Sequence, residues 1–208
     1  MFEPAWQMKS VGSAVTEITK LSDGRTEFTI KHELIFDVTP KMIVWFLNNM
    51  TDIIEISGEM RQRYLIWHPR DHISMTYLRP GNDGSNFQTG AVIRIKEMFN
   101  GERRNKLNIK AKVEFLDESG FAHHETILGL QVARIDYTFN EVSEGTIYEN
   151  KMTIGRAGKG PLSWLINRII QPLVFPKRKG IAWLKHNVEE VGNFQFFLPE
   201  MYKLDNSD

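Results

Sequence analysis

Three places in this sequence put ionisable side chains where burial is expected. The first is Glu97, which lies in residues 90–99. Strand alternation there puts its carboxylate on the same face as Ile93, Ile95 and Phe99. Because an unpaired buried charge costs several kcal/mol, Glu97 must be neutral, paired or bound to a cation. A bulge that reverses the two faces, or a buried arginine that pairs with Glu97, remains an alternative explanation.

The second place is the helical pattern of residues 181–194, where His186 and Glu190 are four positions apart. They share a face with Trp183 and Phe194, and this spacing lets one helix offer two ligands to one metal ion. An ordinary i, i+4 pair on a partly exposed helix is the alternative. On the next stripe of the helix, Lys185 and Glu189 are expected to form a solvated pair.

The third place is the stretch around Pro69, which has His68 on one side and His72 on the other. A proline keeps the residues before it extended, so the two histidines cannot both belong to one regular helix. One of them can still point into a cavity from a turn. Of the other histidines, His32 is expected to be a hydrogen-bonded core residue, whereas His123 and His124 are expected to be solvated near a hairpin turn.

The elements that must position these residues follow from apolar periodicity. Alternation predicts strands over residues 25–36, 63–67, 90–99, 106–115, 125–139 and 146–154. Thr39 as N-cap and Pro40 as first residue predict a helix over residues 39–50. After Gly155 the spacing becomes helical, with interruptions at Pro172 and Pro176.

Strand, helix, antiparallel strands and C-terminal helix together predict an α+β fold of the helix-grip type. In such a fold a curved antiparallel sheet wraps a long C-terminal helix and leaves an internal cavity. We expect one domain over residues 1–208, with residues 1–12 and 203–208 peripheral or flexible.

Composition narrows the chemistry. Lys plus Arg and Asp plus Glu both total 26 among 208 residues, so the formal net charge is zero and nucleic acid is not an expected partner. With 0 cysteines, a metal ion must bind to His, Asp or Glu. The chain shows neither a signal peptide nor a membrane span, which predicts the cytoplasm. A homodimer is possible. Residues 163–179 fit a ligand gate or a surface that touches a membrane transiently.

A family resemblance adds to these predictions. The strings "MIVWFLNNM", "WHPRDH" after Tyr64, "IRIKEMFNG" and "KHNVEEVGNFQFFLPEMY" resemble the 2,4-diacetylphloroglucinol hydrolases, which have a Bet v 1-like or START-like helix-grip fold and a zinc ion in the cavity. The resemblance implies four metal ligands, which are His72, Glu97, His186 and Glu190. Zinc is the expected metal, ahead of iron or manganese.

The same resemblance assigns Tyr64 a catalytic contact with a phenolic substrate. His68 then takes a supporting role outside the ligand set, and Trp183 is expected to lie at the pocket. One position departs from the family: Met75 stands where an asparagine lines the family's pocket.

Two functions are therefore expected from the sequence. The first is a metal-dependent hydrolase that cleaves a carbon–carbon bond next to a carbonyl in an aromatic or polyketide-like ketone. The alternative is a non-catalytic protein that binds or carries a hydrophobic small molecule, as helix-grip cavities commonly do.

Overall fold

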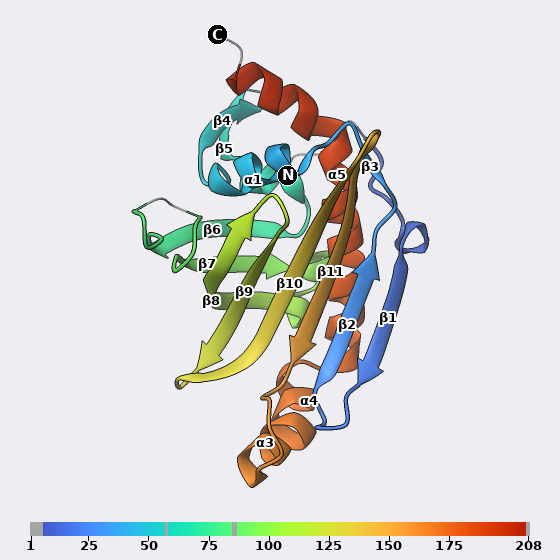
Figure 1. Cartoon of the computed structure of the whole chain (residues 1–208), viewed down its shortest axis with the longest axis vertical. Coiled ribbons are helices and arrows are strands. Elements are labelled where there is room, and N and C mark those ends of the chain that lie inside the picture. Colours follow the sequence, from blue (N-terminus) through green and yellow to red (C-terminus); the bar gives the residue numbers. More distant parts are fainter. Residues whose placement is uncertain (1–5, 57, 85–86, 207–208) are drawn as a thin grey trace.

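The computed structural model describes residues 6–56, 58–84 and 87–206. Within these residues, one antiparallel sheet has the strand order β1-β2-β11-β10-β9-β8-β7-β6, and β3 pairs with β11 (Figure 1). The strands are β1 Val15–Lys20, β2 Thr26–Lys31, β3 Ile35–Phe36, β6 His72–Arg79, β7 Val92–Met98, β8 Lys106–Asp117, β9 Gly120–Ile127, β10 Leu130–Val142 and β11 Gly145–Ile154. A separate hairpin consists of β4 Ile53–Ile56 and β5 Glu59–Gln62.

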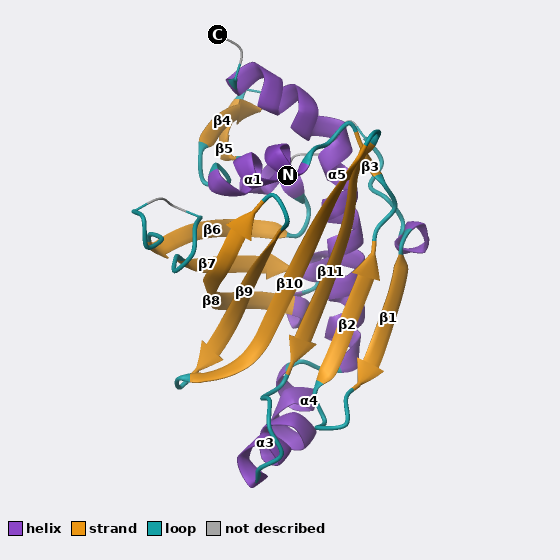
Figure 2. Ribbon diagram, in the orientation of Figure 1, coloured by secondary structure: helices purple, strands orange, loops and turns teal. Residues whose placement is uncertain are grey.

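The long helix α5, Lys177–Asp205, lies in the concave side of this sheet (Figure 2). The other helical elements are α1 Pro40–Asn48, the single turn α2 Tyr64–Trp67, α3 Pro161–Leu165, the π-helical η4 Ile166–Ile170 and α4 Gln171–Val174. Three short 3₁₀ segments are η1 Val11–Ser13, η2 Phe99–Gly101 and η3 Arg103–Asn105. This arrangement confirms the predicted α+β helix-grip fold.

Several local predictions are confirmed. Helix α1 begins at Pro40, and the Thr39 hydroxyl accepts a hydrogen bond from the Met42 amide at 3.3 Å. In β7 the alternation holds, because Ile93 and Glu97 are buried on one face. The predicted interruption at Pro176 is confirmed, because the chain leaves the helical conformation at Phe175 and Pro176 is the N-cap of α5. At Pro172 the helical path is not interrupted, and the π-helical η4 passes directly into α4.

Other local predictions are wrong. The expected strand over residues 63–67 is the helical turn α2, and the strand instead begins at His72. The expected strand over residues 125–139 is two strands, because Leu128 and Gly129 turn the chain with φ values of 51° and 76°. The first part of this hairpin, β9, carries His123.

The strand predicted over residues 25–36 is also interrupted. β2 ends at Lys31, and β3 resumes with the opposite phase, so Ile35 is buried and Phe36 is exposed. The chain leaves the sheet between the two strands. That irregular segment shifts the alternation by one residue.

Helix α5 is buried on more sides than an amphipathic pattern predicts. Its residues from Ala182 to Phe194 face the sheet on one side and the segment of residues 64–72 on the other. The predicted ion pair between Lys185 and Glu189 forms, but Glu189 is only 7% exposed, so its side of the pair is buried rather than solvated. Residues 64–72 therefore cover a side of α5 that the helical period of the sequence predicts to be exposed.

The two terminal segments lie partly outside the described residues, as 1–5 and 207–208 do. Within the described part, Trp6 stacks on Phe197 with ring centroids 6.0 Å apart, and its indole N–H donates to Asn193 at 2.9 Å. At the other end, residues 203–205 continue α5.

Candidate metal centre

Four side chains from three elements converge beside helix α5. His72 opens β6 and pairs directly with Glu97 of β7 in the sheet register, so both side chains stand on the same face. His186 and Glu190 lie one turn apart on α5 and face this pair. All four are at most 9% exposed. The structure therefore brings together the four residues that the sequence analysis selected.

The distances between the nitrogen and oxygen atoms are those of a shared centre. His72 Nε2 lies 3.3 Å from Glu190 Oε2 and 3.6 Å from Glu97 Oε1. His186 Nε2 lies 3.5 Å from Glu190 Oε2 and 3.9 Å from Glu97 Oε1. Two ligands with bonds of about 2.0–2.1 Å to a tetrahedral zinc ion are about 3.3–3.4 Å apart. His72, His186 and Glu190 each offer a ligand atom within 4.8 Å of the other two, and could hold a metal ion. Glu97 Oε1 lies near both imidazoles and would have to move closer to complete a tetrahedral set.

The hydrogen bonding of His72 supports the same conclusion. Its Nδ1 donates to the Tyr64 carbonyl at 2.7 Å, which leaves the lone pair of a neutral ring on Nε2. Within the described residues Nε2 is buried and has no hydrogen-bond partner, although two carboxylates surround it. A lone pair that faces carboxylate oxygens is repelled unless a proton or a cation lies between them. The donor set therefore suits a metal ion.

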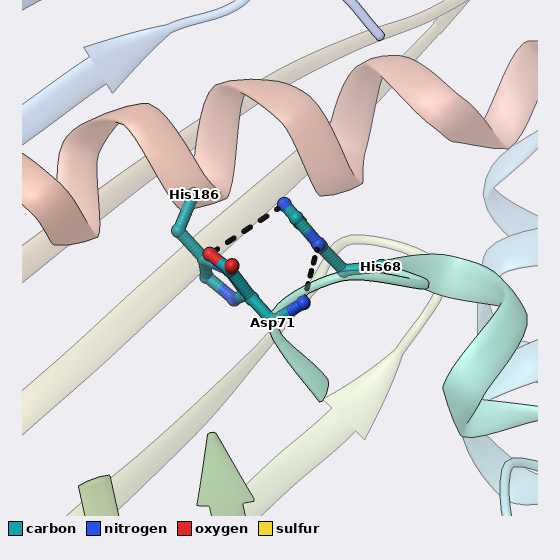
Figure 3. A group of neighbouring side chains, drawn as sticks. All are labelled: His68, Asp71 and His186. Carbon is teal, nitrogen blue, oxygen red and sulfur yellow. Dashed lines mark hydrogen bonds and ion pairs between the residues drawn. The ribbon is translucent and has the colours of Figure 1, made fainter. Parts of the chain in front are cut away.

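His186 is oriented by a carboxylate on its far side. Asp71 Oδ2 lies 3.1 Å from His186 Nδ1, which directs Nε2 toward Glu97 and Glu190. Figure 3 shows Asp71 between the ring of His186, which comes from α5, and the ring of His68, which follows α2. Carboxylates in this position fix the tautomer and orientation of metal-binding histidines. Asp71 itself is held by the Asn100 amide, which donates to Oδ2 at 3.1 Å.

The charges in this cluster shift each other's protonation. Burial favours the neutral carboxyl of Glu190, but His186 and His72 outweigh burial and lower its pKa to about 2. Burial also opposes a charged His186, yet Glu190 and Asp71 raise its pKa well above the usual value. The same balance, with His186 as the main partner, lowers the pKa of Asp71 to about 2. Glu190 and Asp71 are thus ionised and His186 is protonated, so a metal ion that binds here must displace a proton from this imidazole.

Tyr64 and His68 pack against the two histidines of the cluster, with Tyr64 on His72 and His68 on His186. The Tyr64 hydroxyl donates to Glu97 Oε1 at 2.5 Å, and its ring stacks on His72 with centroids 3.8 Å apart. His68 accepts a hydrogen bond from the Asp71 amide through Nδ1, so its Nε2 donates to Glu189 at 3.2 Å. His68 therefore lies outside the converging set, in the supporting position expected for it.

A cavity of about 380 Å³ opens beside the cluster. Glu97, His186 and Glu190 line it together with Trp183, and most of its other walls are apolar. Tyr64 and Met75 line a smaller neighbouring void of about 50 Å³ instead. The larger volume matches the lower range of small-molecule sites in proteins.

Three neighbours of the cluster were not found from the sequence. The helical pattern predicts a solvated Glu189, and no pattern in the sequence gives Asp71 a role, because nothing in one sequence reveals a carboxylate that supports a distant histidine. His123 was expected to be solvated but is 3% exposed and lines the cavity. The strand of residues 120–127 has an alternation that places His123 with Phe121, and recognising the turn at Leu128 would have revealed it.

Comparisons with known proteins define the class by fold. A START superfamily protein from Mycobacterium smegmatis aligns with 85% of this chain and 98% of its own, at a TM-score of 0.51 and 11% identity. A Rhodobacter sphaeroides protein aligns over 88% and 99% with a TM-score of 0.49 and 14% identity. The protein Ara h 8.0201 aligns over 78% and 97% with a TM-score of 0.40 and 13% identity. The first of these alignments shows that the chain has the START-like helix-grip fold.

No family model matches the chain. No curated protein matches it either. The resemblance to the diacetylphloroglucinol hydrolases is therefore supported in its fold but not in its activity. Among the residues that the structure describes, none of the helices is both long and apolar enough to cross a bilayer.

Proposed function

We propose that this chain is a metal-dependent hydrolase that binds a mostly apolar, carbonyl-containing small molecule in its cavity. The observation that carries the proposal is the convergence of His72, Glu97, His186 and Glu190 at the cavity wall. Two imidazoles and two carboxylates suit a borderline divalent ion, and zinc is the first choice. When bound, such an ion polarises a carbonyl oxygen or lowers the pKa of a water molecule toward neutrality.

The chain's own residues would prepare this site. Asp71 and the Tyr64 carbonyl hold the two imidazoles with their Nε2 atoms inward. Burial and the nearby Glu97 raise the pKa of the Tyr64 phenol well above 10, so it stays a hydrogen-bond donor at neutral pH. Its hydrogen bond fixes one carboxylate oxygen. The geometry of the centre is thus set before any ligand enters.

The cavity selects the class of substrate. Its lining includes Ile95, Ile135, Met152 and Trp183, which favour an aromatic or polyketide-like molecule. In hydrolysis of an aryl ketone, the oxygen of water joins the carbonyl carbon. The ring carbon then leaves with the electron pair of the broken bond and takes up a proton. The products are a carboxylic acid and an arene that has lost its acyl group. Met75, buried where the resembled family has an asparagine, argues for a substrate that differs from the family's own.

The second candidate is a binding or carrier protein without turnover. The largely apolar wall of the cavity favours it, as does a fold that tolerates many unrelated functions. In that case a metal ion would hold a ligand carbonyl in place, or the four residues would share protons and bind no metal.

One experiment separates these functions. The purified chain is analysed for metals by mass spectrometry and then incubated with a panel of phenols that carry an acetyl group on a ring carbon, with product detection by chromatography. The hydrolase proposal expects about one zinc, iron or manganese ion per chain and turnover that both disappear in His186→Ala. His124→Ala, in which the lost histidine lies far from the cluster, is the control and should keep both. Metal without turnover, or binding of phenols without metal, would favour the carrier.

A further inference from the structure

The segment that closes one end of the cavity has an inverted distribution of side chains. Ser163, Asn167 and Gln171 are spaced by four residues and are all buried. Asn167 donates to the carbonyls of Asp23 and Arg156 and accepts from the Arg156 amide. A polar face thus anchors α3, η4 and α4 to the fold, which is opposite to an ordinary surface helix.

The outer face of the same segment is apolar. We call it the apolar tip, and it consists of Leu162, Trp164, Leu165, Ile169, Leu173 and Val174. All six side chains are exposed, and Leu173 is 78% exposed. Contiguous apolar surface of this kind is uncommon on a monomeric protein and marks an interaction site.

A second apolar element lies at the same end of the molecule. The β9–β10 turn exposes Ile127 and Leu128, and Figure 1 shows this turn and α3 at the end opposite to the C-terminus. Ile127 lines the cavity, as does Val174 of the apolar tip, so the turn and the tip both reach the same cavity. Exposed apolar surface from two elements therefore lies beside the cavity.

The charged residues around the apolar tip indicate which partner it binds. Although the whole chain is neutral, residues 150–188 contain no Asp or Glu. Lys159, Arg168, Lys177 and Arg178 border the apolar tip, are exposed, and form no ion pair with any described residue. Arg104 and, to a smaller extent, Arg178 lower the pKa of Glu102, so one acidic group lies within electrostatic reach of this border. An apolar surface with a cationic border is complementary to an anionic lipid headgroup layer.

The position of these cations supports an external partner. Lys177 and Arg178 lie in the first turn of α5, and that turn contains no acidic residue. Positive charges there oppose the helix dipole, whose N-terminal end is itself positive. Because they do not stabilise their own helix, a binding role explains them better than a structural one. Trp164 adds a side chain type that is favoured at the lipid–water interface.

We propose that the apolar tip and its cationic border dock on the surface of an anionic phospholipid bilayer. Docking there brings the cavity end lined by Ile170 and Val174 against the membrane, so that an apolar ligand exchanges with the lipid without crossing water. This inference does not depend on a metal ion or on hydrolysis, because every residue that carries it lies outside the metal cluster.

The test is co-sedimentation of the full chain with vesicles of phosphatidylcholine alone or mixed with phosphatidylserine. Binding is expected only to the mixed vesicles and should weaken as salt rises. Leu173→Glu should abolish it. The pair Lys177→Glu and Arg178→Glu should reduce binding roughly fivefold or more per charge, while the acidic residues favour the start of α5 and preserve the fold.

Leu204→Glu is the matched control, since Leu204 is 71% exposed but lies near the C-terminus at the other end of the molecule. It should bind vesicles like the parent. Circular dichroism of each variant checks its folding. Equal binding by the parent and Leu173→Glu, or no binding to the mixed vesicles, would overturn the proposal. So would a parent dimer that Leu173→Glu converts to a monomer without any vesicle binding, because the tip would then cover a second copy.

Discussion

His72 and Glu190, from the first residue of β6 and the middle of α5, place Nε2 and Oε2 3.3 Å apart in a buried site. Because His72 Nδ1 already donates to the Tyr64 carbonyl, the second nitrogen has no proton to give when the ring is neutral. The contact is favourable only with a proton or a metal ion between the two atoms. This pair is the most direct structural indication of a cation site.

Glu190→Gln should remove one ligand while it keeps the shape of the site. The amide oxygen is a weak substitute for a carboxylate, and the attraction between Glu190 and His186 disappears. We expect metal affinity to fall at least about 100-fold, more than the loss that follows from changing a supporting residue. Competition with a chromophoric chelator measures it. Glu200→Gln, an exposed position later on the same helix, should leave affinity unchanged.

Asp71→Asn should weaken the centre without abolishing it. Asp71 does not face the cavity but holds His186 through Nδ1 at 3.1 Å. Loss of such a partner lowers metal affinity about 10–100-fold, because the imidazole becomes less basic and less well oriented. The same chelator competition gives the value. If affinity falls as far as in Glu190→Gln, Asp71 would have to be a ligand itself.

Tyr64→Phe should reduce stability and metal affinity together. The phenol donates to Glu97 Oε1, and its removal leaves a buried carboxylate oxygen without that donor. Hydrogen bonds to charged groups contribute about 1.5–3 kcal/mol, so the free energy of unfolding should fall by that order. Urea titration followed by tryptophan fluorescence measures the change. An unchanged midpoint would mean that water replaces the hydroxyl at no cost.

Much of this centre could be predicted from the sequence, and the reasons differ by residue. Glu97 stood out because strand alternation placed a charge among apolar residues, and β7 kept that alternation. His186 and Glu190 stood out through helical spacing, which α5 preserves. His72 could not be derived in this way, because Pro69 obscured the local structure and the strand that follows it was not recognised. The family resemblance, rather than periodicity, selected it over His68.

The supporting residues could not be predicted, because their role depends on long-range packing. Asp71 and Glu189 reach His186 and His68 only after residues 64–72 fold over α5. No local pattern encodes that cover. The apolar tip was partly foreseen from residues 163–179. The inward polar face that anchors it became visible only once Ser163, Asn167 and Gln171 were seen to be buried.

His123 gives a prediction of pH dependence that is separate from the metal centre. Burial lowers the pKa of this histidine from 6.5 to about 4. Its ring packs against both Phe121 and Tyr137, and its Nδ1 has no hydrogen-bond partner among the described residues. Between these pH values the unfolded chain binds a proton that the folded chain does not. The folded state therefore loses stability as pH falls from about 6.5 toward 4.

His123→Gln should remove this contribution. Between pH 6.5 and pH 4.5, the free energy of unfolding should fall by about 2 kcal/mol more in the parent than in the variant. This value follows from about 1.36 kcal/mol per pKa unit. Urea titrations at each pH, with a chelator present to exclude metal effects, give both curves. His124→Gln is the control, because that ring is partly exposed and hydrogen-bonded to Glu114. If the parent and His123→Gln curves run parallel, the ring takes up its proton in the folded state, and water must reach it through the cavity.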